Sequence, residues 1–135
     1  MVNSRSLDDL IPEAKARATA FISACHAEGI DLLVTSTYRD NEAQDALYAQ
    51  GRTKPGKIVT KAKGGQSMHN YRRALDVVPI VNGKAVWNDA ELWKKIGGLG
   101  KKCGLEWAGD WATFRETPHF QWTNGKTIKD LAAGT

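Results

Sequence analysis

Apolar residues recur at two different spacings along the chain, and each spacing predicts a kind of element. Spacing of three and four residues runs over 12–29, which favours an amphipathic helix there. The apolar, β-rich runs at 32–38 and 74–81 instead predict strands. The Asn-Gly pair at 82–83 is typical of a tight hairpin turn, so we expect the chain to return antiparallel over 84–87.

Capping and turn residues between the remaining apolar runs predict the other elements. We expect helices at 41–50, 89–103 and 127–133, and a strand at 119–122. The glycines at 97, 98 and 100 weaken the second of these helices. A long Lys- and Gly-rich loop runs over 52–65, with a brief strand expected at 58–60. The order of elements predicts a small α+β domain with a central antiparallel sheet flanked by helices.

Size and composition fit one folded unit. The chain has 135 residues, 41% hydrophobic and 25% charged, and we expect a single domain over 1–135. Cys25 and Cys103 lie in apolar helical patterns, which favours buried thiols, although the pattern leaves their redox state open. Three of the five tryptophans fit core positions: Trp87, Trp93 and Trp107.

The net charge of +4 favours an anionic partner without choosing among nucleic acid, membrane and acidic wall polymer. No helix-turn-helix, aromatic RNA-binding motif or zinc-finger spacing is present, so we expect no nucleic-acid partner. No apolar run approaches the roughly 20 residues of a membrane span. The first nine residues have no signal-peptide pattern, which predicts synthesis in the cytoplasm.

Two of the three histidines lie in settings that suggest metal binding. His69 precedes an apolar strand that contains Asp76, and His119 opens another strand. A lone buried carboxylate is costly unless a cation offsets it. Two imidazoles and one carboxylate match a catalytic zinc site, which leaves a position open for water. The alternative is that Asp76 pairs with an arginine, while the histidines serve as a surface loop residue and a hydrogen-bonded sheet residue.

Glu116 stands three residues before His119, with Pro118 between them. Pro118 keeps its preceding residue out of helical conformation, so this E-x-x-H is a turn-to-strand motif. A carboxylate beside a zinc site can accept a proton from the attacking water and return it to the leaving amine. Glu116 is therefore the candidate general base.

Several separated motifs occur in one order. They are S-x-H-x(6)-D at 67–76, E-x-x-H at 116–119, T-S-T-Y-R at 35–39 and the segment 44–53. Together they resemble the LAS-type zinc peptidases, which comprise the D-alanyl-D-alanine carboxypeptidases and L-alanyl-D-glutamate endopeptidases of bacteria and their phages. The likeness covers about residues 7–123 and implies the LAS and hedgehog-like peptidase fold, with the zinc site at the sheet edge.

The resemblance implies one Zn²⁺ per chain. It implies His69, Asp76 and His119 as zinc ligands and Glu116 as the catalytic base.

The resemblance also assigns roles around the metal. Arg39 would face the site, polarise the scissile carbonyl and stabilise the oxyanion, although an ion pair with a nearby acid is the alternative. Ser67 would contact substrate or simply cap a turn, and Gln44 would line the cleft. The family usually has glycine where this chain has Arg72, which indicates either a special backbone conformation or tight packing at that position and leaves the geometry of this loop open.

The expected reaction is hydrolysis of the peptidoglycan stem peptide at the L-alanyl-D-glutamate bond, by an endolysin that lyses the host cell. The alternatives are a D-alanyl-D-alanine carboxypeptidase or dipeptidase of the same family and a non-catalytic, zinc-stabilised wall-binding module. We expect a monomer whose basic surface contacts anionic wall or outer membrane. It would act on the wall, in the periplasm, after release from the cytoplasm.

Overall fold

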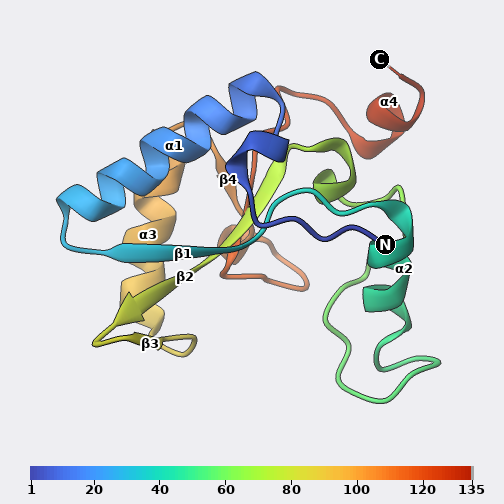
Figure 1. Cartoon of the computed structure of the whole chain (residues 1–135), viewed down its shortest axis with the longest axis horizontal. Helices are drawn as coiled ribbons and strands as arrows, with labels where there is room; N and C mark the ends of the chain where they lie inside the picture. Colours follow the sequence, from blue (N-terminus) through green and yellow to red (C-terminus); the bar gives the residue numbers. More distant parts are fainter. Residues whose placement is uncertain (135) are drawn as a thin grey trace.

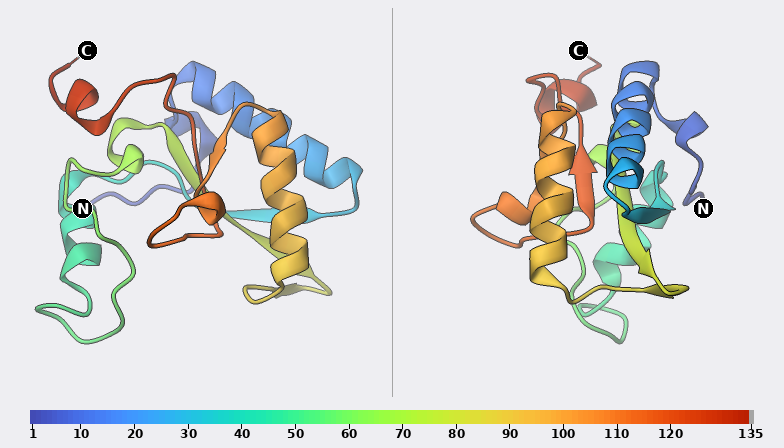
Figure 2. Two further views of the ribbon diagram at one scale, coloured as in Figure 1. Left: turned by 180° about the vertical axis from the view of Figure 1, so that it is seen from behind. Right: turned by 90° about the vertical axis from the view of Figure 1, so that its left-hand side faces the viewer.

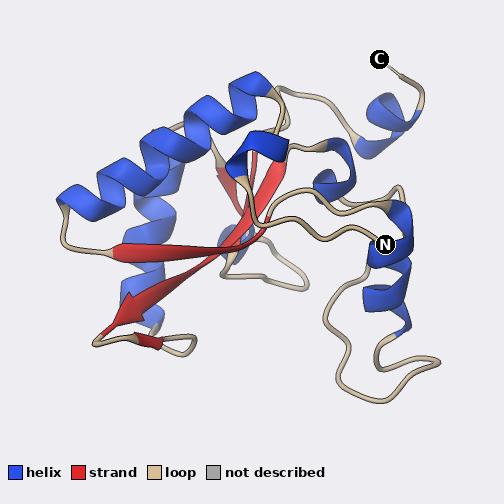
Figure 3. Ribbon diagram, in the orientation of Figure 1, coloured by secondary structure: helices blue, strands red, loops and turns tan. Residues whose placement is uncertain are grey.

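The computed structural model describes residues 1–134. Its longer helices are α1 (Pro12–Ala27), α2 (Asn41–Ala49), α3 (Ala90–Lys102) and α4 (Ile128–Ala132). Three short 3₁₀ turns are η1 (Leu7–Asp9), η2 (Met68–Tyr71) and η3 (Ala108–Asp110). The strands are β1 (Asp31–Ser36), β2 (Ala74–Val81), β3 (Lys84–Ala85), β4 (Glu106–Trp107) and β5 (His119–Gln121). The predicted α+β class with an antiparallel sheet is confirmed (Figure 3).

The sheet has the order β1-β2-β5-β4, and β3 pairs with the end of β2 as a hairpin. Every pair is antiparallel. Side chains alternate between the two faces of a strand. Leu75 and Val77 therefore share one face of β2, while Asp76 between them points to the other. This alternation separates the core from the functional face of the sheet.

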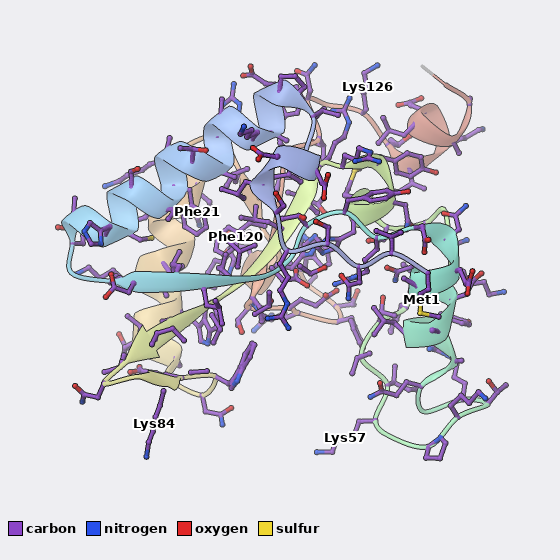
Figure 4. All side chains as sticks on the ribbon, in the orientation of Figure 1. Met1, Phe21, Lys57, Lys84, Phe120 and Lys126 are labelled. Carbon is purple, nitrogen blue, oxygen red and sulfur yellow. The ribbon has the colours of Figure 1, made fainter. Side chains whose placement is uncertain are left out.

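Helices α1 and α3 contact each other and pack on the sheet to form the core (Figures 1 and 2). Phe21 of α1 and Phe120 of β5 are both fully buried, and their ring centroids are 4.5 Å apart. The two labelled rings lie side by side beneath α1 in Figure 4. Helix α2 and the loop that follows it lie at the other end of the molecule from α3 (Figures 1 and 2). Burial of large apolar side chains at about 25 cal/mol per Å² supplies the main stabilisation.

The glycines of α3 do more than weaken a helix. A Cβ added at Gly97 would lie 2.3 Å from the Trp107 ring, and one at Gly100 would lie 2.5 Å from the Phe120 ring. Both glycines thus let the helix backbone approach aromatic side chains of β4 and β5. Strand β4 was not predicted, because two residues of strand carry no periodic pattern.

Two further expectations are wrong. Residues 58–60 form no strand, although Thr60 is buried by side-chain contacts. Trp93 and Trp107 are buried as expected, but Trp87 is 49% exposed because it follows the short β3 hairpin beyond the core.

Cys25 is buried, Cys103 is partly buried, and both are free thiols. None of the helices within residues 1–134 has the length and apolar character needed to cross a membrane.

Candidate metal centre

His69 is held in the short turn η2 just before β2. The Ser67 hydroxyl caps this turn by accepting a hydrogen bond from the His69 backbone N–H at 3.2 Å, and Asn70 completes a capping box. The imidazole is 1% exposed. Its Nδ1 lies 2.6 Å from the Thr37 carbonyl oxygen, which only accepts hydrogen bonds. Nδ1 therefore carries the proton, and Nε2 of a neutral ring presents a lone pair.

Asp76 and His119 are brought together by strand pairing, because they are directly opposite in the β2–β5 ladder. Both side chains point to the face of the sheet away from α1 and α3. His119 is 5% exposed, and its Nε2 lies 2.8 Å from the Gln121 side-chain oxygen. Nε2 thus donates to Gln121, and Nδ1 of the neutral ring is left as a lone pair that faces Asp76.

Three electron-donating atoms converge as a result. His69 Nε2 and His119 Nδ1 each lie 3.1 Å from Asp76 Oδ1, and they lie 3.2 Å from each other. Ligand atoms around a tetrahedral zinc ion with bonds of about 2.0–2.1 Å are roughly 3.3 Å apart. The three side chains therefore fit a divalent ion, and of the common ions their imidazole and carboxylate chemistry suits zinc.

The charges of this cluster agree with a cation site. Burial opposes ionisation of Asp76, but the neighbouring His69 and His119 bring its pKa well below the usual range. Burial lowers the pKa of His69, which keeps that ring neutral. Burial also disfavours charge on His119, yet its contacts with the Asp76 carboxylate raise its pKa overall. A proton and a metal ion thus compete for the same position.

Arg39 neutralises the second oxygen of the aspartate. Its Nη2 lies 2.8 Å from Asp76 Oδ2, and its side chain is only 11% exposed. The guanidinium also donates through Nε to Ser36 Oγ and through Nη1 to Gln44 Oε1, both at 3.1 Å. Arg39 lines the cleft and is fixed by three partners at once.

Gln44, expected to line the cleft, is instead 1% exposed behind Arg39. Its amide nitrogen donates to the Ala62 carbonyl at 2.9 Å and lies 3.4 Å from Thr60 Oγ1. Its position on α2 points it into the protein, where it ties Arg39 to the 60–62 loop. Any effect of Gln44 on a ligand would pass through these neighbours.

Glu116 lies in the same cleft as the three candidate ligands. The cleft has a volume of about 600 Å³, which is within the usual range for ligand sites. Trp111 forms part of its wall, and the centroids of the Trp111 and His119 rings are 5.6 Å apart. Burial raises the pKa of the half-buried Glu116 carboxyl, against the attraction of His119. A carboxyl with a raised pKa beside a cation site is suited to proton transfer.

Arg72 adopts a special backbone conformation, one of the two possibilities that the family's glycine left open. It ends η2 with φ 61° and ψ 35°, the left-handed region that glycine occupies most easily. Its guanidinium lies 3.9 Å from the centroid of the Tyr38 ring, and Nη1 donates to the Asp9 carbonyl at 3.0 Å. The turn that carries His69 therefore keeps its geometry without glycine.

The chain is similar in sequence to known peptidases. It is 39% identical over 122 residues to the peptidoglycan L-alanyl-D-glutamate endopeptidase CwlK of Bacillus subtilis (strain 168), covering 84% of this chain and 73% of that protein. An M15 family model described as D-alanyl-D-alanine carboxypeptidase matches residues 60–122, which include the three candidate ligands and Glu116. The chain belongs to the M15 family of peptidases. The L-alanyl-D-glutamate peptidase of Listeria phage A118 is 32% identical over 127 residues, covering 87% of this chain and 41% of the phage protein.

Solved structures with the same fold include other peptidases. The L-Ala D-Glu endopeptidase ChiX of Serratia marcescens superposes with a TM-score of 0.65 at 21% identity, over 97% of this M15 chain and 92% of that chain. The vancomycin resistance D,D-pentapeptidase VanY in complex with Zn(II) superposes with a TM-score of 0.64 at 14% identity, over 92% of this chain and 78% of that chain. These likenesses confirm the fold.

Sequence reasoning missed the groups that orient the two imidazoles. The Thr37 carbonyl could not be found, because every residue has a backbone oxygen. Gln121 did carry a signal, since it stands two residues after His119 on the predicted strand and therefore shares its face.

Proposed function

We propose that this M15 peptidase uses one zinc ion to hydrolyse the peptide stem of bacterial peptidoglycan. The observation that carries the proposal is the convergence of two ring nitrogens and one carboxylate oxygen in a cleft that also contains Glu116. Held by His69, Asp76 and His119, zinc would act as a Lewis acid and lower the pKa of water to roughly 7.

Glu116 is proposed as the general base. It accepts a proton from the water that attacks the scissile carbonyl, and it returns that proton to the leaving amine. Its raised pKa suits both steps, because a poised carboxyl both takes and gives a proton readily. A non-catalytic wall-binding module would not need this carboxylate in the cleft.

Arg39, Ser67 and Gln44 are proposed to support the reaction around the zinc. The Arg39 guanidinium lines the cleft and places positive charge where an oxyanion develops. Ser67 also lines the cleft, and its substrate contact would accompany its capping of η2. Gln44 would act on substrate only by holding Arg39 in place.

The favoured bond is that between L-alanine and D-glutamate. Two curated relatives more than 30% identical to this chain are named for that bond. The second candidate is D-alanyl-D-alanine carboxypeptidase or dipeptidase activity, which the description of the matching family model favours. Both reactions need the same zinc and base, so the products alone decide between them.

We further propose that the protein acts as a monomeric endolysin in host lysis, reaching the wall from the cytoplasm and degrading it with bacteriolytic effect. The phage relative supports this biological role. The net charge of +4 would hold the enzyme near anionic wall or outer membrane.

The test is digestion of purified peptidoglycan by the zinc-loaded enzyme, with the products identified by mass spectrometry. We expect new amino-terminal D-glutamate, and a loss of about 10²–10⁴-fold in rate for Glu116→Gln with zinc content unchanged. Release of free D-alanine without new D-glutamate termini would establish the carboxypeptidase instead. Equal rates for the wild type and Glu116→Gln would reject Glu116 as the base.

A further inference from the structure

A chain of hydrogen bonds leads from the metal centre to the surface through three residues. His119 Nε2 lies 2.8 Å from Gln121 Oε1, and Gln121 Nε2 donates to Glu106 Oε2, also at 2.8 Å. Thr123 Oγ1 donates to the other oxygen of Glu106 at 3.2 Å. Gln121 is 9% exposed, whereas Glu106, at the outer end of this series of hydrogen bonds, is exposed.

The backbone places these residues in register. His119 and Gln121 are two residues apart on β5, so their side chains share a face. Glu106 is directly opposite Gln121 in the β4–β5 pair. The two-residue strand β4 therefore sets a carboxylate against the Gln121 amide.

The chemistry of each group determines the orientation of the next. A carboxylate only accepts hydrogen bonds, so the –NH₂ of Gln121 must face Glu106 and its oxygen must face His119. An amide oxygen also only accepts, so His119 must carry its proton on Nε2. A neutral imidazole has one N–H, which leaves Nδ1 free to bind a metal.

We propose that Gln121 and Glu106 are positioning residues, which hold His119 in the tautomer and ring orientation that present Nδ1 to the metal. The inference rests on the proposed zinc site. Partners of this kind raise metal affinity because they remove the tautomers and rotations that cannot bind.

The first test replaces Gln121 with methionine, which has similar size and no strong acceptor. Zinc is withdrawn from the holoprotein by a chelator of known affinity, which gives the zinc dissociation constant. We expect an increase of about 10–100-fold for Gln121→Met. An unchanged constant in a folded variant would overturn the proposal.

The second test reverses the direction of donation along these hydrogen bonds by a substitution at the exposed residue Glu106. A lysine at position 106 only donates, so in Glu106→Lys the Gln121 oxygen turns outward and its –NH₂ faces His119. We expect the proton of the neutral His119 ring to move from Nε2 to Nδ1, visible in long-range ¹H–¹⁵N NMR spectra of the metal-free protein recorded at a pH at which this ring is neutral, together with weaker zinc binding. Glu106→Gln retains an acceptor oxygen and should bind zinc as the wild type does.

Glu91→Lys is the matched control, because it makes the same charge change at an 89% exposed side chain of α3. It should leave both the tautomer and the zinc constant unchanged. Equal behaviour of Glu106→Lys and Glu91→Lys would contradict the proposal, even if Gln121→Met failed to fold. If the wild type bound no zinc, the metal site would fail, while the His119 tautomer would still test the positioning.

Discussion

Side chains around the cleft have fixed orientations because each is bonded at the end away from the site. His69 is anchored by the Thr37 carbonyl, His119 by Gln121, and Asp76 by Arg39. Glu116 differs, since burial outweighs the attraction of His119 and Arg39 and leaves its pKa raised. A carboxyl with a raised folded-state pKa binds its proton more tightly in the folded than in the unfolded protein.

This shift predicts how stability depends on pH. As pH rises from the ordinary glutamate pKa through the raised pKa of Glu116, the metal-free wild type should lose stability that Glu116→Gln keeps. The measurement is the free energy of unfolding of both proteins in denaturant at several pH values. Their difference should favour the variant above this window and shrink below it. A difference independent of pH would contradict the burial of an ionisable Glu116.

Arg72 permits a second test at this scale. Arg72→Ala and Arg72→Gly both lose the contacts with Tyr38 and Asp9, but only alanine keeps the cost of the left-handed backbone. We expect the glycine variant to be about 1 kcal/mol more stable than the alanine variant. Thermal or denaturant unfolding measures the difference, and an alanine variant as stable as the glycine variant would argue against φ 61° at this position.

Among the elements, α3 shows how the sequence pattern can mislead. Gly97 and Gly98 look equally unfavourable for a helix, yet an added Cβ meets the Trp107 ring at Gly97 and nothing within 4 Å at Gly98. Gly97→Ala should therefore destabilise the protein by about 1–3 kcal/mol through overpacking. Gly98→Ala should stabilise it by about 0.5–1 kcal/mol through helix propensity. Two variants of the same sign would contradict the close packing of α3 on β4.

The elements that could be predicted from sequence are those with a periodic pattern or strong turn signals. Helix α1 and strand β2 are long and clearly patterned, and Asn82-Gly83 indicates the β2–β3 turn. Strand β4 has two residues, and its pairing with β5 depends on contacts distant in sequence. The brief strand expected at 58–60 had β-branched residues but no neighbouring strand to pair with.

Across the whole molecule, the candidate metal centre joins segments that are far apart in the chain. His69 and Asp76 flank the start of β2, whereas His119 lies on β5. The ligand types and the E-x-x-H spacing were visible in the sequence. Their convergence depends on the β2–β5 register, and the pairing of Glu106 with Gln121 depends on the β4–β5 register. Neither register follows from local patterns.

Zinc bound between these segments should stabilise the fold. A ligand that binds only the folded state at 100 times its dissociation constant adds about 2.7 kcal/mol to the free energy of unfolding. Zinc should therefore raise the melting temperature of the wild type and of His26→Ala, which changes the exposed third histidine. It should not raise that of Asp76→Asn. Equal zinc effects on all three proteins would place the binding elsewhere.

The most direct measurement is anomalous X-ray diffraction at the zinc edge from crystals of the zinc-loaded protein. We predict one strong peak at about 2.0–2.2 Å from His69 Nε2, Asp76 Oδ1 and His119 Nδ1, in the cleft that contains Glu116. A zinc-loaded, folded protein whose anomalous peak lay away from these three atoms would contradict the account.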